Sequence, residues 1–169
     1  MNISAEIQVA SEGDDVPDPE SISGWLREVM RNQTVMNLNS PADNEQTAEV
    51  CVRIVDVEEI EYLNSTYRHK PGSTNVLSFP SQLPADIPLR QLGDIVICAA
   101  VVNNEAAQQY KTPQAHWAHM VIHGALHLLG YDHENDDDAE VMEDLETQIL
   151  QGMGFPSPYA DSLPSQTVA

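Results

Sequence analysis

The chain has 169 residues, of which 41% are hydrophobic and 20% are charged, a composition typical of one globular domain of ordinary size. Seven lysines and arginines stand against 27 aspartates and glutamates, so the formal net charge is −20. This excess of acid argues against a broad basic face that grips duplex nucleic acid, DNA included, or an anionic membrane. No apolar run approaches the roughly 20 residues of a membrane span. The N-terminus lacks the pattern of a signal peptide, so we expect a cytoplasmic protein.

The first 80 residues alternate between strand-like and helix-like patterns. Apolar residues at helical spacing predict helices, and β-branched or apolar runs bounded by prolines and polar residues predict strands. The expected elements are a strand at 7–10, a helix at 21–30, a strand at 50–55, a helix at 57–67 and a strand at 75–79. Acidic, proline-bearing residues 12–20 and polar residues 37–46 predict loops.

The second half continues with one strand and three helices. We expect a loop at 82–91, a strand at 94–98 bounded by Gly93, and helices at 99–110, 113–129 and 136–151. The last helix is expected to turn Val141, Leu145 and Ile149 inward. Together these elements predict an α+β fold: a small mixed sheet of about four strands packed with about five helices. Residues 1–154 then form a single domain, and residues 155–169 a flexible C-terminal tail.

The helix at 113–129 has clear start and stop signals. Thr112 suits the N-cap position and Pro113 the first helical position, while Gly130 suits the left-handed residue that follows a helix. The helix holds four of the six histidines of the chain. At 100° per residue they form one stripe about 80° wide, at positions 116, 119, 123 and 127.

Three histidines around the end of this helix have the spacing of metal ligands. His123 and His127 are four residues apart, so their rings project from one face of the helix one turn apart. Gly130 lets the chain turn sharply and bring His133 back toward them. Three imidazoles with an open fourth position are typical of a catalytic zinc site, so one divalent ion, with Zn²⁺ favoured, is expected on His123, His127 and His133. Nickel, copper or iron would also fit imidazole ligands.

The spacing of these histidines also matches the zinc-peptidase pattern H-E-x-x-H-x-x-G-x-x-H. Gly124, however, stands where those peptidases carry the glutamate that acts as general base. Asp132 is near in sequence, and orienting a ligand imidazole is at least as good an interpretation of it as general base. His116 and His119 lie one and two turns away, and we expect them to be hydrogen-bonded or solvent-facing.

Further motifs accompany the histidines. They are Asn64-Ser65-Thr66-Tyr67-Arg68-His69-Lys70, Thr74-Asn75-Val76-Leu77-Ser78-Phe79-Pro80, Gly93-Asp94-Ile95, and the string from His123 to His133. Together they resemble the YbeY endoribonucleases of bacteria, and the likeness runs from about residue 50 to residue 154. Residues 115–120 also resemble the gammaproteobacterial members.

The resemblance implies a single-strand-specific, metal-dependent endoribonuclease that matures ribosomal RNA, including the 3′ end of the small-subunit RNA, and takes part in ribosome quality control. It implies single-stranded RNA and the ribosome or its proteins as partners. It also implies catalytic roles for His123, His127 and His133 as the metal ligands and for Arg68 as the functional arginine. Arg68 and Lys70 form the one tight cationic cluster of the sequence.

The chemistry of these residues agrees with that function. A divalent ion lowers the pKa of bound water and polarises a phosphoryl oxygen, and an arginine fork stabilises charge that develops on phosphate. Attack by activated water and attack by the 2′-hydroxyl of the RNA both remain open. The alternatives are a non-catalytic ribosome-assembly factor and, disfavoured by Gly124, a metallopeptidase.

The acidic charge limits how such a protein can meet RNA. Residues 134–146 carry eight acids, which we interpret as a solvated helix face. Such a surface repels RNA over a long footprint. We therefore expect a short single strand in a local cleft, or delivery of the RNA by a protein partner.

Overall fold

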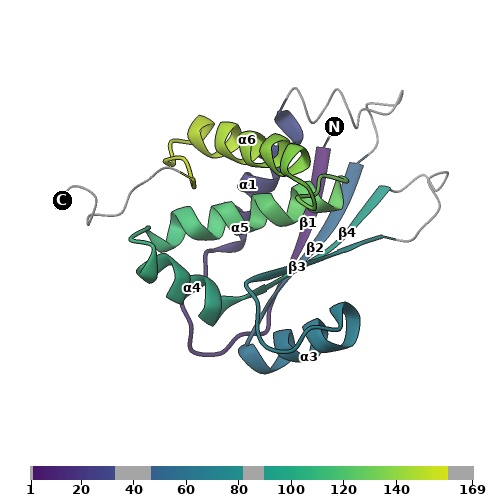
Figure 1. Cartoon of the computed structure of the whole chain (residues 1–169), viewed down its shortest axis with the longest axis vertical. Helices are drawn as coiled ribbons and strands as arrows, with labels where there is room; N and C mark the ends of the chain where they lie inside the picture. The colour runs from purple at the N-terminus through teal and green to yellow at the C-terminus, as the bar shows by residue number, and fades with distance from the viewer. Residues whose placement is uncertain (1, 33–46, 82–89, 160–169) are drawn as a thin grey trace.

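Figure 1 shows the chain as a computed structural model, which describes residues 2–32, 47–81 and 90–159. The described residues form four strands and five helices: β1 (Asn2–Val9), α1 (Pro19–Arg31), β2 (Thr47–Val55), α3 (Val57–Arg68), β3 (Val76–Pro80), β4 (Arg90–Cys98), α4 (Ala99–Gln108), α5 (Pro113–Leu128) and α6 (Asp136–Gly152). The strands lie in one sheet in the order β1-β2-β4-β3. β2 pairs in parallel with β1 and β4, whereas β3 runs antiparallel to β4 at the edge. The expected α+β fold with a mixed sheet is confirmed.

The two faces of the sheet carry separate cores because side chains alternate along each strand. Val52, Ile54 and Ile95 point to the face covered by α1 and α5, where the main hydrophobic cluster lies. Val96 and Leu77 point to the other face, where a smaller cluster packs under α3. Figure 1 shows α5 and α3 on opposite sides of the sheet, with α6 lying over α5.

Two boundaries differ from the sequence prediction for local reasons. The expected loop at 12–20 ends early because the Asp18 carboxylate caps α1, accepting the Ser21 N–H at 2.8 Å, and Pro19 opens the helix. Gly93 does not bound β4 but lies inside it, at φ +136°, where a Cβ would come within 2.2 Å of the Phe79 carbonyl oxygen. A glycine therefore allows β3 to approach β4 at this point. The loop expected at 37–46, and residues 82–89 of the next expected loop, lie outside the described residues.

The inward face of α6 differs from the prediction. Val141 is 49% exposed, whereas Met142 is 1% exposed and packs in the core. Leu145 and Ile149 are buried as expected. The buried stripe of α6 therefore passes through Met142 instead of Val141, about 100° further round the helix, and extends to Glu146 and Leu150.

The segment after α6 also packs against the domain. The Phe155 ring meets the Trp25 ring of α1 edge-on, with 6.5 Å between centroids. The Tyr159 side chain reaches Glu146 of α6. The first five residues of the expected tail thus make defined contacts, and its remainder lies outside the described residues.

Candidate metal centre

Helix α5 is delimited by the residues that the sequence indicates. The Thr112 hydroxyl accepts the Ala115 N–H at 3.1 Å, and Pro113 opens the helix. At the other end Gly130 has φ +101°, a left-handed conformation that costs glycine little. The chain leaves the helix there and returns toward it, which places His133 beside the last turns of α5.

The structure brings His123, His127 and His133 together. One nitrogen of each ring lies within 4.8 Å of the corresponding nitrogens of the other two. The ring centroids are 4.7 Å apart for His123 and His127, 5.1 Å for His127 and His133, and 5.5 Å for His123 and His133. His123 and His127 are half-buried and His133 is exposed, so the group opens to solvent on one side.

The surroundings of His127 favour the neutral imidazole that a metal requires. Burial lowers the pKa of His127, and the neighbouring His123 and His133 lower it further. Three nitrogen donors with one open side match a catalytic zinc site, which keeps its fourth position for water or substrate. The donor set therefore fits a divalent ion, while ligand type alone does not select which one.

Gly124 fits closely against the sheet. A Cβ at this position would lie 2.8 Å from Ile95 Cγ2 and 3.3 Å from the Ser78 hydroxyl oxygen. Ile95 is fully buried, so it cannot move aside without disturbing the core. Position 124, which carries the general base in zinc peptidases, thus has no room for a glutamate in this fold. This steric restriction disfavours the metallopeptidase interpretation.

Arg68 is connected to this turn of α5 through β3. The last residue of α3, it donates from Nη2 to the Ser78 carbonyl oxygen at 3.0 Å. The Ser78 hydroxyl, on the opposite side of the strand, donates to the Gly124 carbonyl oxygen at 3.0 Å. Two hydrogen bonds therefore link Arg68 to the residue after His123. No direct contact joins Arg68 to the three histidines among the described residues.

Asp132 interacts with the turn that carries His133. Its Oδ1 atom accepts the backbone N–H of His133 at 2.7 Å. This contact restrains the loop after Gly130 and agrees with an orienting role for Asp132 rather than a catalytic one.

The other two histidines of α5 are buried and bound to carboxylates. His116 Nε2 lies 2.8 Å from Glu105 Oε1 of α4, and His119 Nε2 lies 3.0 Å from Glu146 Oε1 of α6. Burial lowers the pKa of His116, against the opposing effect of Glu105. As expected from the sequence, both residues are hydrogen-bonded and stand outside the group of three.

Glu146 is the residue that the sequence reasoning missed. It belongs to the acidic run 134–146, interpreted as a solvated face, yet its exposed fraction is 0%. Its Oε2 atom lies 2.6 Å from His123 Nδ1, and its Oε1 atom accepts the Tyr159 hydroxyl. A signal was present in the sequence, since Glu146 follows Met142 and Leu145 on the helical stripe that continues to Ile149.

His119, His123 and Glu146 form a second close group of possible metal ligands, but their contacts are hydrogen bonds. Burial opposes ionisation of Glu146, yet the hydrogen bonds from His119 and His123 outweigh it and lower its pKa to about 2. Burial, followed by the contact with Glu146, raises the pKa of Tyr159, so its hydroxyl stays protonated and donates. The carboxylate is already satisfied by three donors from the chain itself.

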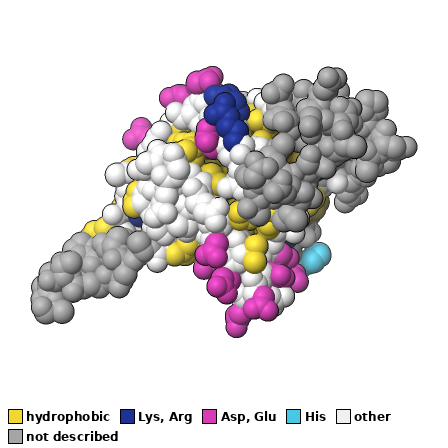
Figure 2. All heavy atoms as spheres, turned by 90° about the horizontal axis from the view of Figure 1, so that it is seen from above, with side chains coloured by type: hydrophobic (Ala, Val, Ile, Leu, Met, Phe, Trp, Pro, Cys, Tyr) yellow, Lys and Arg dark blue, Asp and Glu magenta, His cyan; other side chains and the backbone are white. Residues whose placement is uncertain are grey.

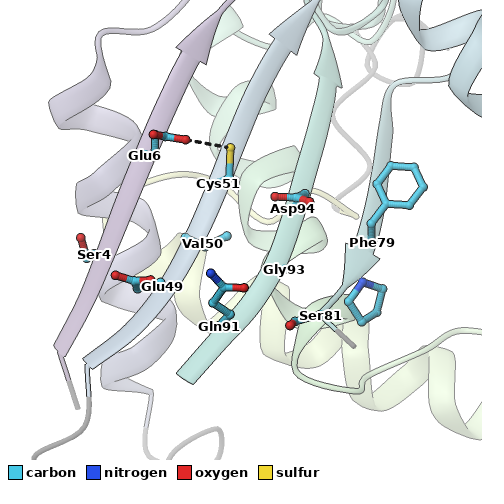
Figure 3. A pocket seen from close by; sticks show the side chains of 11 residues that line it. Ser4, Glu6, Glu49, Val50, Cys51, Phe79, Ser81, Gln91, Gly93 and Asp94 are labelled. Carbon is cyan, nitrogen blue, oxygen red and sulfur yellow. Dashed lines mark hydrogen bonds between the residues drawn. The ribbon is translucent and has the colours of Figure 1, made fainter. Parts of the chain in front are cut away.

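A cavity of about 690 Å³ lies on the α3 side of the sheet, away from the histidines. Figure 3 shows Glu6, Glu49, Cys51 and Asp94 on its floor. Burial, then Asp94 and Glu6, raise the pKa of Cys51 to about 11, which leaves the thiol unreactive at neutral pH. Its lining holds carboxylates and a protonated thiol, but among the described residues it includes no imidazole and no cationic side chain. The histidine side of the sheet is therefore the candidate active site.

Comparison with known proteins identifies the family of this chain. The family model of Endoribonuclease YbeY matches residues 7–154. This match covers β2, β3, β4, α5, α6 and all three clustered histidines. The chain belongs to the YbeY endoribonuclease family. It is accordingly an RNA-cleaving hydrolase of ribosomal RNA processing.

A solved structure has a similar fold. The solution structure of TM1509 from Thermotoga maritima is 26% identical and covers 92% of this chain and 97% of its own, with a TM-score of 0.52. The narrower likeness of residues 115–120 to gammaproteobacterial members is not borne out by the comparisons. Among the described residues, no helix is long and apolar enough to cross a membrane.

Proposed function

We propose that this YbeY-family chain is a single-strand-specific metallo-endoribonuclease that matures the 3′ end of small-subunit ribosomal RNA and takes part in ribosome quality control. Residues 1–154 form its domain. The observation that carries the proposal is the group of His123, His127 and His133, held within 4.8 Å of one another beside a glycine instead of a general base. Proteins of the ribosome are its proposed partners.

The three histidines supply the ligands of one divalent ion, with Zn²⁺ favoured by imidazole chemistry. When bound, such an ion supplies Lewis acidity that lowers the pKa of water and polarises a phosphoryl oxygen. His127 contributes an unprotonated nitrogen because its pKa is lowered. The turn at Gly130, restrained by Asp132, keeps the exposed His133 next to the two helical histidines.

Arg68 is the proposed phosphate-binding residue. A guanidinium carries five N–H donors, and the described contacts use one of them, on the Ser78 carbonyl. Its side chain is exposed at the end of α3, so the remaining donors are accessible to a phosphate. A bidentate fork of this kind stabilises charge that develops during phosphoryl transfer. The contact with Ser78 fixes one arm of the fork on β3, the strand that also hydrogen-bonds to α5 at Gly124.

The acidic surface of α6 restricts the substrate. Asp136, Asp137 and Asp138 are exposed in its first turn, directly after His133. Acidic side chains crowd the lower edge of the face seen in Figure 2. The phosphates of a duplex that ran along the acidic surface of α6 would be strongly repelled by these carboxylates. A short single strand needs only a few phosphate contacts. This supports a preference for single-stranded RNA.

A paired cleavage assay tests the proposal. The full chain, loaded with zinc, is incubated with an end-labelled RNA strand alone and with the same strand annealed to its complement. We expect cleavage of the single strand and protection of the duplex. Equal cleavage of both, or a duplex preference, would contradict the proposal.

The ends of the products identify the nucleophile. A 5′-phosphate on the downstream fragment indicates attack by water, while a 2′,3′-cyclic phosphate on the upstream fragment indicates attack by the RNA's own 2′-hydroxyl. The neighbouring carboxylates have contacts of their own, Asp132 with the His133 N–H and Glu146 with its three donors, so the product ends decide between the two routes.

A further inference from the structure

Glu146 is a buried carboxylate in the centre of the inward face of α6. Met142, Leu145, Ile149 and Leu150 surround it along the helix and are all buried. An ionisable group is retained in such an apolar stripe only when hydrogen bonds offset its loss of hydration. The hydrogen-bond partners of Glu146 therefore indicate its structural role.

Both oxygens of Glu146 are engaged. Oε2 faces His123 Nδ1 at 2.6 Å, and Oε1 meets His119 Nε2 at 3.0 Å together with the Tyr159 hydroxyl. Because Oε1 is fixed by two donors, the carboxylate cannot swing away, and Oε2 is held against one particular nitrogen of His123.

We propose that Glu146 is a positioning residue of the metal centre, which fixes the ring and tautomer of His123, and that Tyr159 anchors Glu146 for this task. An imidazole has two nitrogens, and the one that donates to a carboxylate carries the hydrogen. With Nδ1 donating to Glu146, Nε2 is left with its lone pair for the side shared with His127 and His133. The inference rests on the proposed function for the role of the metal.

His116 shows what the same contact does in the opposite orientation. Glu105 meets His116 at Nε2, and the remaining Nδ1 is buried without a hydrogen-bond partner in the described residues. No nitrogen of that ring is therefore offered to a ligand at the surface. At His123, Glu146 faces Nδ1 and leaves Nε2 available, which distinguishes this ligand-orienting contact from the structural contacts through Nε2 of His116 and His119.

The segment after α6 becomes part of the metal centre through Tyr159. The Tyr159 backbone N–H donates to the Ser157 hydroxyl at 3.3 Å, and that hydroxyl lies 3.5 Å from Thr147 Oγ1 of α6. Phe155 is seated against Trp25. These contacts hold the segment against α6, so that the Tyr159 hydroxyl meets the oxygen of Glu146 that does not face His123.

The tautomer of His123 is the most direct test. Long-range ¹H–¹⁵N spectra of the metal-free full chain at pH 8, above the usual imidazole pKa of about 6.5, distinguish the two neutral forms. We expect the Nδ1–H form for His123, and a shift toward the Nε2–H form in Glu146→Gln. Glu140→Gln, an equal charge change at an exposed position of α6, should leave the spectrum unchanged. An Nε2–H form in the wild type, or no response to Glu146→Gln, would overturn the proposal.

Zinc affinity provides a second readout, measured by competition with a chromophoric chelator. Loss of a partner that orients a ligand typically weakens metal binding about 10- to 100-fold, which we expect for Glu146→Gln. Tyr159→Phe keeps the ring and removes the hydroxyl, so it should fold normally and weaken zinc binding by a smaller factor. Tyr110→Phe, at an exposed tyrosine, is its control. Wild-type affinity in Tyr159→Phe would overturn the role of Tyr159.

The two proposals fail differently. If the wild-type chain holds no divalent ion but His123 shows the Glu146-dependent Nδ1–H form, the positioning of His123 stands and the metal step of the proposed function is wrong. If zinc binds tightly and RNA is cleaved while His123 is indifferent to Glu146, the proposed function stands and the positioning role is wrong.

Discussion

Helix α5 carries histidines in two contrasting surroundings. In its first half, His116 and His119 are buried, and each is hydrogen-bonded to a carboxylate. In its second half, His123 and His127 are half-buried and join His133 in a group open to solvent. All four helical histidines lie on one stripe, so sequence spacing alone does not separate them.

The neighbours of each half account for the difference. The first half packs against α4, which supplies Glu105, so the ring of His116 is enclosed. The second half lies against β3 and is followed by the turn at Gly130. Glu146 of α6 contacts one nitrogen of His123 there, and the group of three rings stays open to solvent on one side. A histidine becomes a candidate ligand when one of its nitrogens stays accessible beside other imidazoles, as at His123, whose other nitrogen faces Glu146. Four comparisons of variants can break or sharpen this account of α5 and the site around it.

The largest effect is expected for His127→Ala. Removing a ligand should abolish zinc binding and reduce RNA cleavage by more than the about 100-fold loss that follows removal of a ligand-orienting partner. His116→Ala should retain zinc but lower the free energy of unfolding by about 2 kcal/mol, through a cavity and an unpaired Glu105. Metal analysis measures zinc binding, a cleavage assay measures the RNA cleavage rate, and urea denaturation measures the free energy of unfolding. Loss of zinc in His116→Ala with retention in His127→Ala would reverse the comparison.

Arg68→Ala should reduce cleavage by about 100- to 1,000-fold, the usual consequence of removing a donor to developing charge, and leave zinc content unchanged. Arg31→Ala, at an exposed position of α1, is the matched loss of one positive charge and should have little effect. Rates under single-turnover conditions give the comparison. Equal rates for the two variants would remove Arg68 from the active site.

Two mid-helix glycines should respond to alanine with opposite signs. Gly24→Ala meets only the Arg27 guanidinium at 3.6 Å, so the better helix propensity should raise stability by about 0.5–1 kcal/mol. Gly124→Ala forces a Cβ against buried Ile95, and overpacking that costs about 1–3 kcal/mol should outweigh the helix gain. Thermal and urea unfolding measure both. Stabilisation by Gly124→Ala would show that α5 has room for a side chain at the peptidase position.

The smallest effect concerns pH. Burial holds the pKa of His116 below its ordinary value of 6.5, so the unfolded chain binds more protons there than the folded chain. The stability from this group is complete above pH 6.5 and is lost as pH falls from 6.5 toward the lower folded pKa. His116→Gln should therefore flatten the decline in unfolding free energy between pH 7 and pH 5, by at most about 1.4 kcal/mol per pH unit. An identical decline in both proteins would show that His116 is not buried as a neutral ring.

The sequence predicted the grouped histidines because their geometry is local. The spacing of His123 and His127 on one helix and the glycine turn before His133 require no knowledge of the rest of the fold. The connection of Arg68 to α5 was different, since it passes through Ser78 of β3 and depends on how α3 and α5 flank the same strand. No local pattern contains that information, and only the resemblance singled out Arg68.

Glu146 was missed because the sequence pattern predicted Val141, instead of Met142, as a buried residue of α6. With Val141 inward, Glu146 belongs to the acidic side; with Met142 inward, it enters the core. The long acidic run also made solvation the natural interpretation of every member. A single acid at core spacing among apolar residues was the usable signal. Gly93 was misplaced for a similar reason, since a glycine bounds a strand more often than it permits close approach of a neighbour.

Chelation and reconstitution of the full chain test the central claim that the three-histidine group holds the ion that RNA cleavage requires. Single-stranded RNA is incubated with the wild-type chain as purified, after chelator treatment, and after return of one equivalent of Zn²⁺. We expect about one bound ion per chain, the occupancy of a single three-histidine site, together with loss of cleavage after chelation and its recovery on return of the ion. Full cleavage by metal-free chain would contradict the claim. Zinc binding with no cleavage in any state would instead favour a non-catalytic ribosome-assembly factor.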